Sequence, residues 1–82
     1  MTENEKINYE LWLKQFGKIV SASRKRQNLT QRQAALKVGF SLKFYQDVEY
    51  GRRPITTRTL FQLVERLDLP IPYFQSIIVL CG

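Results

Sequence analysis

Apolar positions between residues 7 and 26 recur at steps of three and four, which is the period of an α-helix rather than of a strand. Basic side chains fall largely outside this apolar face. We expect the helix to end near Asn28, because asparagine enters the left-handed conformation at lower cost than most other residues. The face predicted to point inward consists of Trp12, Phe16, Ile19, Val20 and Ser23.

A second, shorter helix is predicted from the segment "LTQRQAAL". Thr30 and Gln33 fit the capping box S/T-x-x-E/Q, in which each side chain satisfies a backbone N–H that the first turn leaves free. Ala35 and Val38 continue the apolar face, and Gly39 supplies the positive φ that a sharp turn needs. The predicted helix therefore begins at Thr30 and is about two turns long.

Ser41 is a natural N-cap for a third helix, "SLKFYQDVEY", and Gly51 is a natural end for it. Two such short helices joined by so few residues cannot lie antiparallel and must cross steeply. Residues 29–51 are therefore predicted to form a helix-turn-helix. In the third helix we expect Phe40, Tyr45 and Val48 to point inward, and Leu42, Lys43, Gln46 and Asp47 to face solvent.

Two further helices complete the predicted fold. Thr56 or Thr57 can cap a fourth helix, with apolar positions at Leu60, Leu63, Val64 and Leu67, that closes at "DLP". Residues 70–82 are predicted to form a C-terminal helix or tail with Pro72 in the first turn, although the β-branched "IIVLC" also fits a strand. This segment is more apolar than one small domain can cover. We therefore expect a homodimer interface at Ile77, Ile78 and Leu80, with core packing as the alternative.

The chain has 82 residues, of which 44% are hydrophobic, enough for one compact core. We expect a single domain over residues 1–82, with residues 1–15 as an N-terminal arm and the start of the first helix. The span from Lys14 to Arg58 holds 11 of the 13 basic residues and 2 of the 7 acidic ones, a local net charge of +9. Such clustering favours a polyanionic partner, although a surface charged for solubility is the alternative.

The residue inventory offers little for catalysis. There is no His, and the single Cys is Cys81, so no metal cluster, catalytic triad or pair of base and nucleophile can be assembled. We therefore expect no enzyme activity and no cofactor. One Cys excludes an intrachain disulfide, which agrees with a reducing cytoplasm. The polar N-terminus lacks the features of a secretory signal, and the longest apolar run is too short to span a membrane, so we expect a soluble cytoplasmic protein.

Four segments in order resemble the phage repressor and Cro family of DNA-binding proteins, also called XRE-type. They are "FGKIVSASRKRQNLTQ", "AALKVGFS", "VEYGRRPIT" and "TLFQLVERLDLPIPYF". The resemblance runs from about Phe16 to Phe74. It implies an all-α fold, a compact five-helix lambda-repressor-like domain with the helix-turn-helix at helices two and three. It also implies a protein encoded by a bacterium or a phage.

The resemblance also implies roles for single residues. Ser41, Leu42, Lys43, Gln46 and Asp47 match positions of the recognition helix that face base edges in the major groove. Gln31 and Arg32 match the start of the second helix, and Arg52 and Arg53 the following loop, where family members contact phosphates. Arg24 and Glu49 match an ion pair between the first and third helices. Phe44 and Asp47 depart from the residues usual in the family, so Asp47 either reads a base, rejects wrong sequences, or marks a loss of DNA binding.

These features predict a sequence-specific double-stranded DNA-binding transcriptional regulator, of the repressor or controller type, that binds a palindrome as a homodimer. A toxin or another regulator is a further candidate partner. Two other interpretations remain open. The first is a protein-interaction module on the same fold, such as an antitoxin or a phage accessory protein. The second is binding of nucleoid DNA or RNA without base discrimination.

Overall fold

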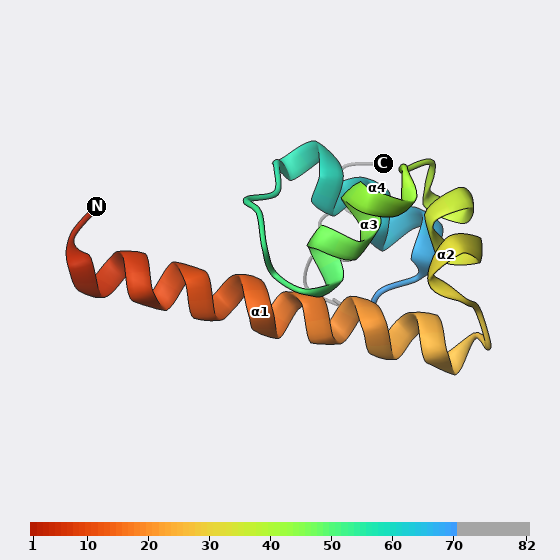
Figure 1. Cartoon of the computed structure of the whole chain (residues 1–82), viewed down its shortest axis with the longest axis horizontal. Coiled ribbons are helices and arrows are strands. Elements are labelled where there is room, and N and C mark those ends of the chain that lie inside the picture. The colour runs from red at the N-terminus through yellow and green to blue at the C-terminus, as the bar shows by residue number, and fades with distance from the viewer. Residues whose placement is uncertain (71–82) are drawn as a thin grey trace, which may run out of the picture.

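The fold of residues 1–70 is described by a computed structural model, in which four α-helices follow one another along the chain. They are α1 (Glu3–Arg26), α2 (Gln31–Val38), α3 (Leu42–Glu49) and α4 (Thr57–Leu67). Figure 1 shows α2, α3 and α4 gathered on one side of α1, whose N-terminal half projects beyond them. The all-helical prediction is confirmed for this part of the chain. The predicted fifth helix, its strand alternative and the expected interface at Ile77, Ile78 and Leu80 fall outside the described residues.

The helix ends follow the local signals in the sequence. Thr30 caps α2 in a complete capping box with Gln33, Ser41 caps α3, and Thr56 rather than Thr57 caps α4. The chain turns after α1 at Asn28 (φ 58°) and after α2 at Gly39 (φ 82°). These are the two left-handed positions that the sequence predicts between the first three helices.

Residues 1–15, predicted as an arm and the start of the first helix, are helical from Glu3 onward, which is earlier than the periodic segment that begins at residue 7. Thr2 and Glu5 form a second capping box, in which the Thr2 hydroxyl accepts from the Glu5 N–H and the Glu5 carboxylate accepts from the Thr2 N–H. The same T-x-x-E pattern is present in the sequence and could have located the start. Because of this earlier start α1 spans 24 residues, or about 36 Å at 1.5 Å per residue.

Each helix contributes buried apolar side chains to one shared core. Tyr45 and Val48 of α3 meet Leu63 and Val64 of α4 and Val38 of α2, all nearly inaccessible to solvent. Half-buried side chains pack around this centre, among them Leu29, Phe40, Phe44, Ile55 and Leu60. The core therefore lies between the steeply crossing α2 and α3 and the two helices that hold them.

The inward face of α1 differs in part from the predicted one. Phe16, Val20 and Ser23 are buried, as expected, and Leu13 and Gly17 join them. Ile19, on the predicted apolar face, is 40% exposed, and Trp12, which was predicted to pack in the core or at an interface, is 49% exposed. Trp12 instead lies at the edge, with its ring stacked on Phe16 at a centroid distance of 5.5 Å. The face of α1 that packs against the other helices is thus rotated about the helix axis, relative to the predicted face, toward Leu13 and Gly17.

Two glycines allow α1 to approach the C-terminal end of α3. A Cβ atom at Gly17 would overlap the backbone carbonyls of Val48 and Glu49. A Cβ atom at Gly51, which also has a positive φ of 65°, would press on the backbone of Lys14. Helix α1 therefore supports α3 by direct contact between backbones.

Candidate nucleic-acid interface

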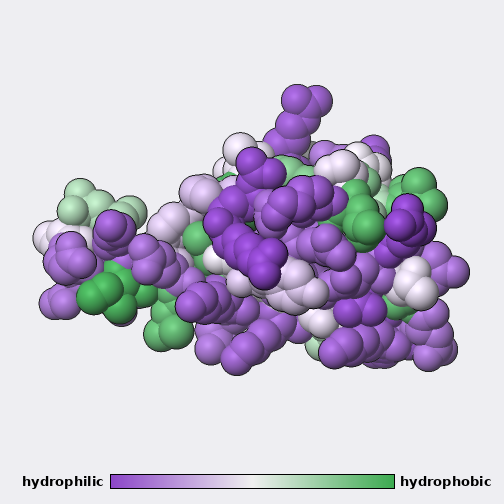
Figure 2. Space-filling view, viewed as in Figure 1, coloured by the Kyte–Doolittle hydropathy of each residue, from purple (hydrophilic) through white to green (hydrophobic). Residues whose placement is uncertain are grey.

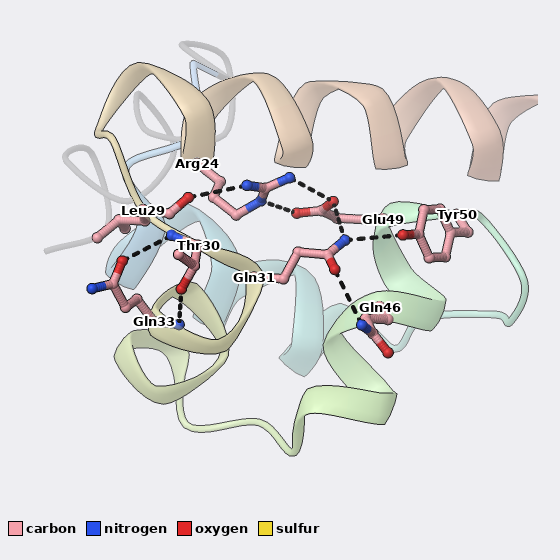
Figure 3. A network of polar contacts seen from close by, with 8 residues as sticks. All are labelled: Arg24, Leu29, Thr30, Gln31, Gln33, Gln46, Glu49 and Tyr50. Carbon is pink, nitrogen blue, oxygen red and sulfur yellow. Dashed lines mark hydrogen bonds and ion pairs between the residues drawn. The ribbon is translucent and has the colours of Figure 1, made fainter.

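The start of α2 is connected to α3 by the side chain of Gln31. Its amide nitrogen donates to Glu49 Oε1 at 3.0 Å and to the Tyr50 hydroxyl at 3.2 Å, and its amide oxygen accepts from Gln46 Nε2 at 3.1 Å (Figure 3). Both ends of the Gln31 amide are thus occupied within the protein. Arg32, the next residue, is exposed. The two residues predicted to contact phosphate therefore differ, one being held in place and the other free to reach outward.

Beneath Gln31, Arg24 of α1 forms an ion pair with Glu49 of α3. Arg24 Nε lies 2.6 Å from Glu49 Oε2, Arg24 Nη2 lies 3.3 Å from Oε1, and the side chains are only 13% and 3% exposed. Arg24 also donates to the carbonyl of Leu29 in the turn before α2. Burial alone raises the pKa of Glu49, but hydrogen bonds led by the one from Arg24 outweigh it and lower that pKa. The pair thus fixes α1, α3 and the entry to α2 relative to one another.

Tyr45 lies beside this pair in the core. Burial and the neighbouring Glu49 carboxylate raise the pKa of its hydroxyl. The hydroxyl is buried, and among the described residues it has no hydrogen-bond partner at good geometry. The Tyr45 ring is itself fully buried among the core side chains, so packing of the ring contributes to holding it in this position.

The outer side of α3 carries a cluster of charged side chains. Lys43 Nζ lies 2.8 Å from Asp47 Oδ1, one turn further along the helix, and Arg52 Nη1 lies 3.8 Å from the same oxygen. Lys43 and Arg52 are 75% and 59% exposed, whereas Asp47 is 15% exposed. The hydrogen bond from Lys43 lowers the pKa of Asp47, and the charges of Lys43, Arg53 and Arg52 act in the same direction. Asp47 is thus an ionised acceptor shared by two cations.

Aromatic rings hold the two arginines of the loop after α3. The Arg52 guanidinium lies 4.6 Å from the centre of the Tyr50 ring, and that of Arg53 lies 4.7 Å from the centre of the Phe44 ring. Phe44 in turn packs edge-on against Phe40. Stacking of this kind restricts a long side chain while leaving its N–H groups available. Phe44, which departs from the family pattern, therefore holds Arg53 of the loop through this stacking contact.

Most of the residues predicted to contact DNA thus lie on one connected surface. Contacts link Gln31 to Gln46 across the turn, Lys43 and Arg52 to Asp47, and Arg53 to Phe44. Strongly hydrophilic side chains cover the body over α3 and the loop after it (Figure 2). Ser41 uses its hydroxyl to cap α3, accepting from the Phe44 N–H at 3.2 Å, and Leu42 beside it is half-buried. Ammonium, guanidinium, amide and carboxylate groups together can both bind phosphates and hydrogen-bond base edges.

Residue-by-residue prediction missed a second set of basic groups beside this surface. A shallow groove between α1 and the loop after α3 is lined by Lys6 and Lys14 on one side and by Arg52 and Arg53 on the other. The sequence carried no signal for it, because the groove exists only where the projecting part of α1 passes the loop. Glu10 lines the groove as well, so Lys6 and Lys14 add two basic groups beside Arg52 and Arg53 next to one acidic side chain.

Residues 20–74 match a family model described as helix-turn-helix, which covers more than half of the chain. The chain belongs to the XRE-type helix-turn-helix family. This family is one of DNA-binding transcription regulators. No curated protein shows significant similarity to the chain.

The XRE-type match covers α2, α3 and α4 and the C-terminal part of α1, so the projecting half of α1 lies outside it. Within residues 1–70, no group of acidic or Cys side chains is arranged to hold a metal ion. None of the four described helices is long and apolar enough to cross a membrane.

Proposed function

We propose that this XRE-type protein is a sequence-specific double-stranded DNA-binding regulator of the repressor or controller type, acting as a homodimer on a palindromic operator. The observation that carries the proposal is the convergence of Lys43 and Arg52 on Asp47, beside the start of α2. It brings groups suited to base edges and groups suited to phosphates onto one exposed surface.

On this proposal the base-reading residues are Ser41, Leu42, Lys43, Gln46 and Asp47. Lys43 donates to guanine O6 and N7, and Asp47 accepts from cytosine N4. Guanine O6 and N7 and cytosine N4 lie on the two bases of one G·C pair. Two neighbouring side chains, Lys43 and Asp47, are therefore suited to read the two bases of that pair together. Reading a base then requires Lys43 to turn from Asp47 toward the groove, which its 75% exposure allows.

Phosphate binding is assigned to Gln31, Arg32, Arg52 and Arg53. Arg32 stands exposed in the first turn of α2, where backbone N–H groups and the helix dipole favour an anion. Gln31 shares its amide with Gln46 and Glu49, so its part is to orient Gln46 as well as to approach a phosphate. The loop arginines are restrained by stacking, which reduces the entropy lost on binding.

A single recognition helix reads only a few base pairs. A two-fold dimer places two such helices about one helical turn apart and doubles the sequence that is read. Ile77, Ile78 and Leu80 remain the proposed dimer interface. We propose that the protein works in a bacterial cytoplasm without a cofactor or catalytic activity, and that its concentration, its dimerisation or a protein partner such as a toxin sets its occupancy of DNA.

A second candidate is a protein-interaction module with no specific DNA reading. Two observations favour it: the Lys43 ammonium is already paired with Asp47, and both ends of the Gln31 amide are occupied. When the polar groups of a recognition surface already bond to one another, contacts with DNA add less binding free energy. The first proposal is preferred because Lys43, Arg52 and Arg32 remain exposed.

The deciding experiment is selection of random duplexes by the purified protein at physiological salt, followed by sequencing of the retained DNA. Enrichment of a palindrome supports the proposal and gives the half-site spacing. Retention without enrichment indicates nonspecific nucleic-acid binding, which falls steeply with salt. No retention at any salt concentration leaves the interaction module.

A further inference from the structure

Helix α1 exposes a stripe of large apolar side chains on the side away from the core, formed by Ile7, Leu11, Trp12 and Ile19. These side chains are 40 to 55% exposed. They recur at steps of four, one and seven residues, which keeps them on one side of a helix with 3.6 residues per turn. Hydrophobic atoms are visible along the projecting half of α1 in Figure 2. A helix with apolar side chains on two opposite sides has two packing surfaces, and the body covers only one.

The side of α1 that carries these residues is apolar toward its centre and charged toward its C-terminal end. Asn8 and Gln15 lie between the apolar positions, and both are exposed. Lys14 and Lys18, which follow Ile7 and Leu11 by seven residues, lie on the same side and are also exposed. The Trp12 ring is held by its stacking on Phe16, so the largest apolar side chain of the stripe is already ordered.

The charges along α1 indicate what covers the stripe. The first ten residues carry Glu3, Glu5 and Glu10 against one basic residue, Lys6, whereas Lys14 and Lys18 follow with no acidic residue as far as Arg26. One end of the helix is therefore acidic and the other basic. An acidic end repels nucleic acid, whereas a second α1 lying antiparallel offers a basic segment to each acidic end.

The geometry of a two-fold pair agrees with these charges. Glu3 and Lys18 are about four turns apart on the same flank of α1, and Leu11 lies midway between them. A two-fold axis near Leu11 brings Glu3 of each copy beside Lys18 of the other and places Ile7, Leu11 and Trp12 of the two copies in contact, with Ile19 outside that contact. In an isologous dimer the same patch serves both subunits. The projecting half of α1 stands clear of the body, which leaves room for a partner helix alongside (Figure 1).

We propose that Ile7, Leu11 and Trp12 of this stripe bind the same residues of a second copy, with the two α1 helices antiparallel. This self-association surface is distinct from the C-terminal residues named above. It also lies outside the part of the chain that matches the family model.

The first test is sedimentation equilibrium of the full chain without DNA, in a background of Ile78→Ser that removes the C-terminal contact proposed above, so that its outcome depends neither on DNA reading nor on that contact. Leu11→Ser is expected to raise the dimer dissociation constant by at least about tenfold, because the change is made twice at the centre of the contact. Leu36→Ser is the matched control, since Leu36 is 77% exposed on α2, and it should leave the constant unchanged. A monomeric Ile78→Ser chain, or a chain with both Leu11→Ser and Ile78→Ser that dimerises as well as Ile78→Ser alone, would overturn the proposal.

A charge exchange tests the antiparallel arrangement. Lys18→Glu and Glu3→Lys are each expected to weaken the dimer, and the double variant is expected to regain most of the lost affinity. Circular dichroism of each variant checks that α1 is intact. A double variant as weak as the poorer single variant contradicts the pairing of Glu3 with Lys18.

Trp12 supplies a third measurement, because it is the one Trp in the chain. Its emission is expected to shift to longer wavelength on dilution, in step with dissociation of the dimer. Short-wavelength emission that stays constant in a monomer means that another segment of the same chain covers the stripe. Emission that stays constant across a dissociating dimer means that the copies meet elsewhere. Either result rules out the proposed contact.

Discussion

Lys43 and Asp47 are bound to each other on the outer side of α3, with Nζ of Lys43 2.8 Å from Oδ1 of Asp47. The family resemblance places both residues at base-reading positions. In the free protein the Asp47 carboxylate neutralises the lysine, and Arg52 approaches the same oxygen. On the proposed function, DNA binding replaces these internal contacts with contacts to bases and phosphates, and a sequence that satisfies all three groups is favoured.

Replacing Lys43 by Ala is expected to relax preference at one base pair in each half-site, at a cost of roughly 1 to 3 kcal/mol. The reason is that an ammonium group bonded to guanine distinguishes it from the other bases. Binding of cognate and singly substituted duplexes measures the effect. Lys25→Ala is the matched control, because Lys25 is exposed outside the helix-turn-helix. Equal weakening of all duplexes by Lys43→Ala would reassign Lys43 to phosphate.

Asp47→Asn is expected to act in the opposite direction on overall affinity. Loss of the carboxylate releases Lys43 and Arg52 and removes repulsion from phosphates, so binding to scrambled duplexes should rise several-fold. The ratio of cognate to scrambled affinity should fall, because the acceptor for a cytosine amino group is lost. Titrations with both duplexes measure the ratio, and Asp68→Asn controls for the charge. An unchanged ratio would show that Asp47 takes no part in discrimination.

Arg24→Ala is expected to lower the free energy of unfolding by about 3 kcal/mol, because it leaves the Glu49 carboxylate buried without its cation. Urea denaturation measures this change. Arg24→Lys keeps the charge without the two-pronged hydrogen bond and should fall between the variant and the wild type. Lys25→Ala removes an exposed ammonium group from the same turn and should change stability by less than about 0.5 kcal/mol. If Arg24→Ala lowers the free energy of unfolding by no more than this control does, the ion pair between Arg24 and Glu49 contributes little to stability.

The same pair predicts the response of stability to acid. The pKa of Glu49 is lowered in the folded protein from its ordinary value of 4.5, so the unfolded chain takes up the proton first as the pH falls. The stabilisation from Glu49 is therefore complete above about pH 4.5 and is lost as the pH falls through the folded pKa. Unfolding free energies measured from pH 6 downward should decline less in Glu49→Gln than in the wild type. Parallel decline of the two proteins would contradict this role.

Gly17→Ala tests the contact between backbones. At an exposed helix position this change stabilises a protein by roughly 0.5 to 1 kcal/mol. At Gly17 the added methyl group meets the carbonyls of Val48 and Glu49, so we expect a loss of about 1 to 3 kcal/mol instead. Thermal or urea denaturation gives the sign directly. A stabilised variant would show that α1 can move away from α3 at little cost.

Local signals predicted the helix ends, whereas the placement of side chains required the whole fold. Thr30, Asn28 and Gly39 act through their own backbone and nearest neighbours, so the sequence is sufficient to predict their roles. Trp12 and Ile19 were misplaced because periodicity shows that a helix has an apolar side but not which part of that side the body covers. Gly17 was overlooked because a contact made by backbone atoms leaves no trace in an apolar pattern.

For the candidate interface, too, the sequence predicted which residues take part but not how their side chains contact one another. The resemblance brought Lys43, Asp47 and Arg52 into consideration, but it treated each as a separate contact to DNA. That Asp47 joins the other two depends on where the loop after α3 returns, which no local pattern specifies. The links from Gln31 to Gln46 and Glu49 likewise follow from the crossing of α2 over α3.

The last carbonyl of α2 has a consequence for attempts to transplant this DNA-reading unit. The Val38 oxygen accepts hydrogen bonds from Gln62 Nε2 at 3.0 Å and from Arg66 Nη1 at 3.1 Å, both on α4. Helix α2 has only eight residues and is therefore too short to be stable alone in water. A peptide or chimera that ends at residue 51 lacks both donors and exposes this carbonyl. Moving the specificity of α3 into another scaffold thus requires Thr57–Leu67 as well.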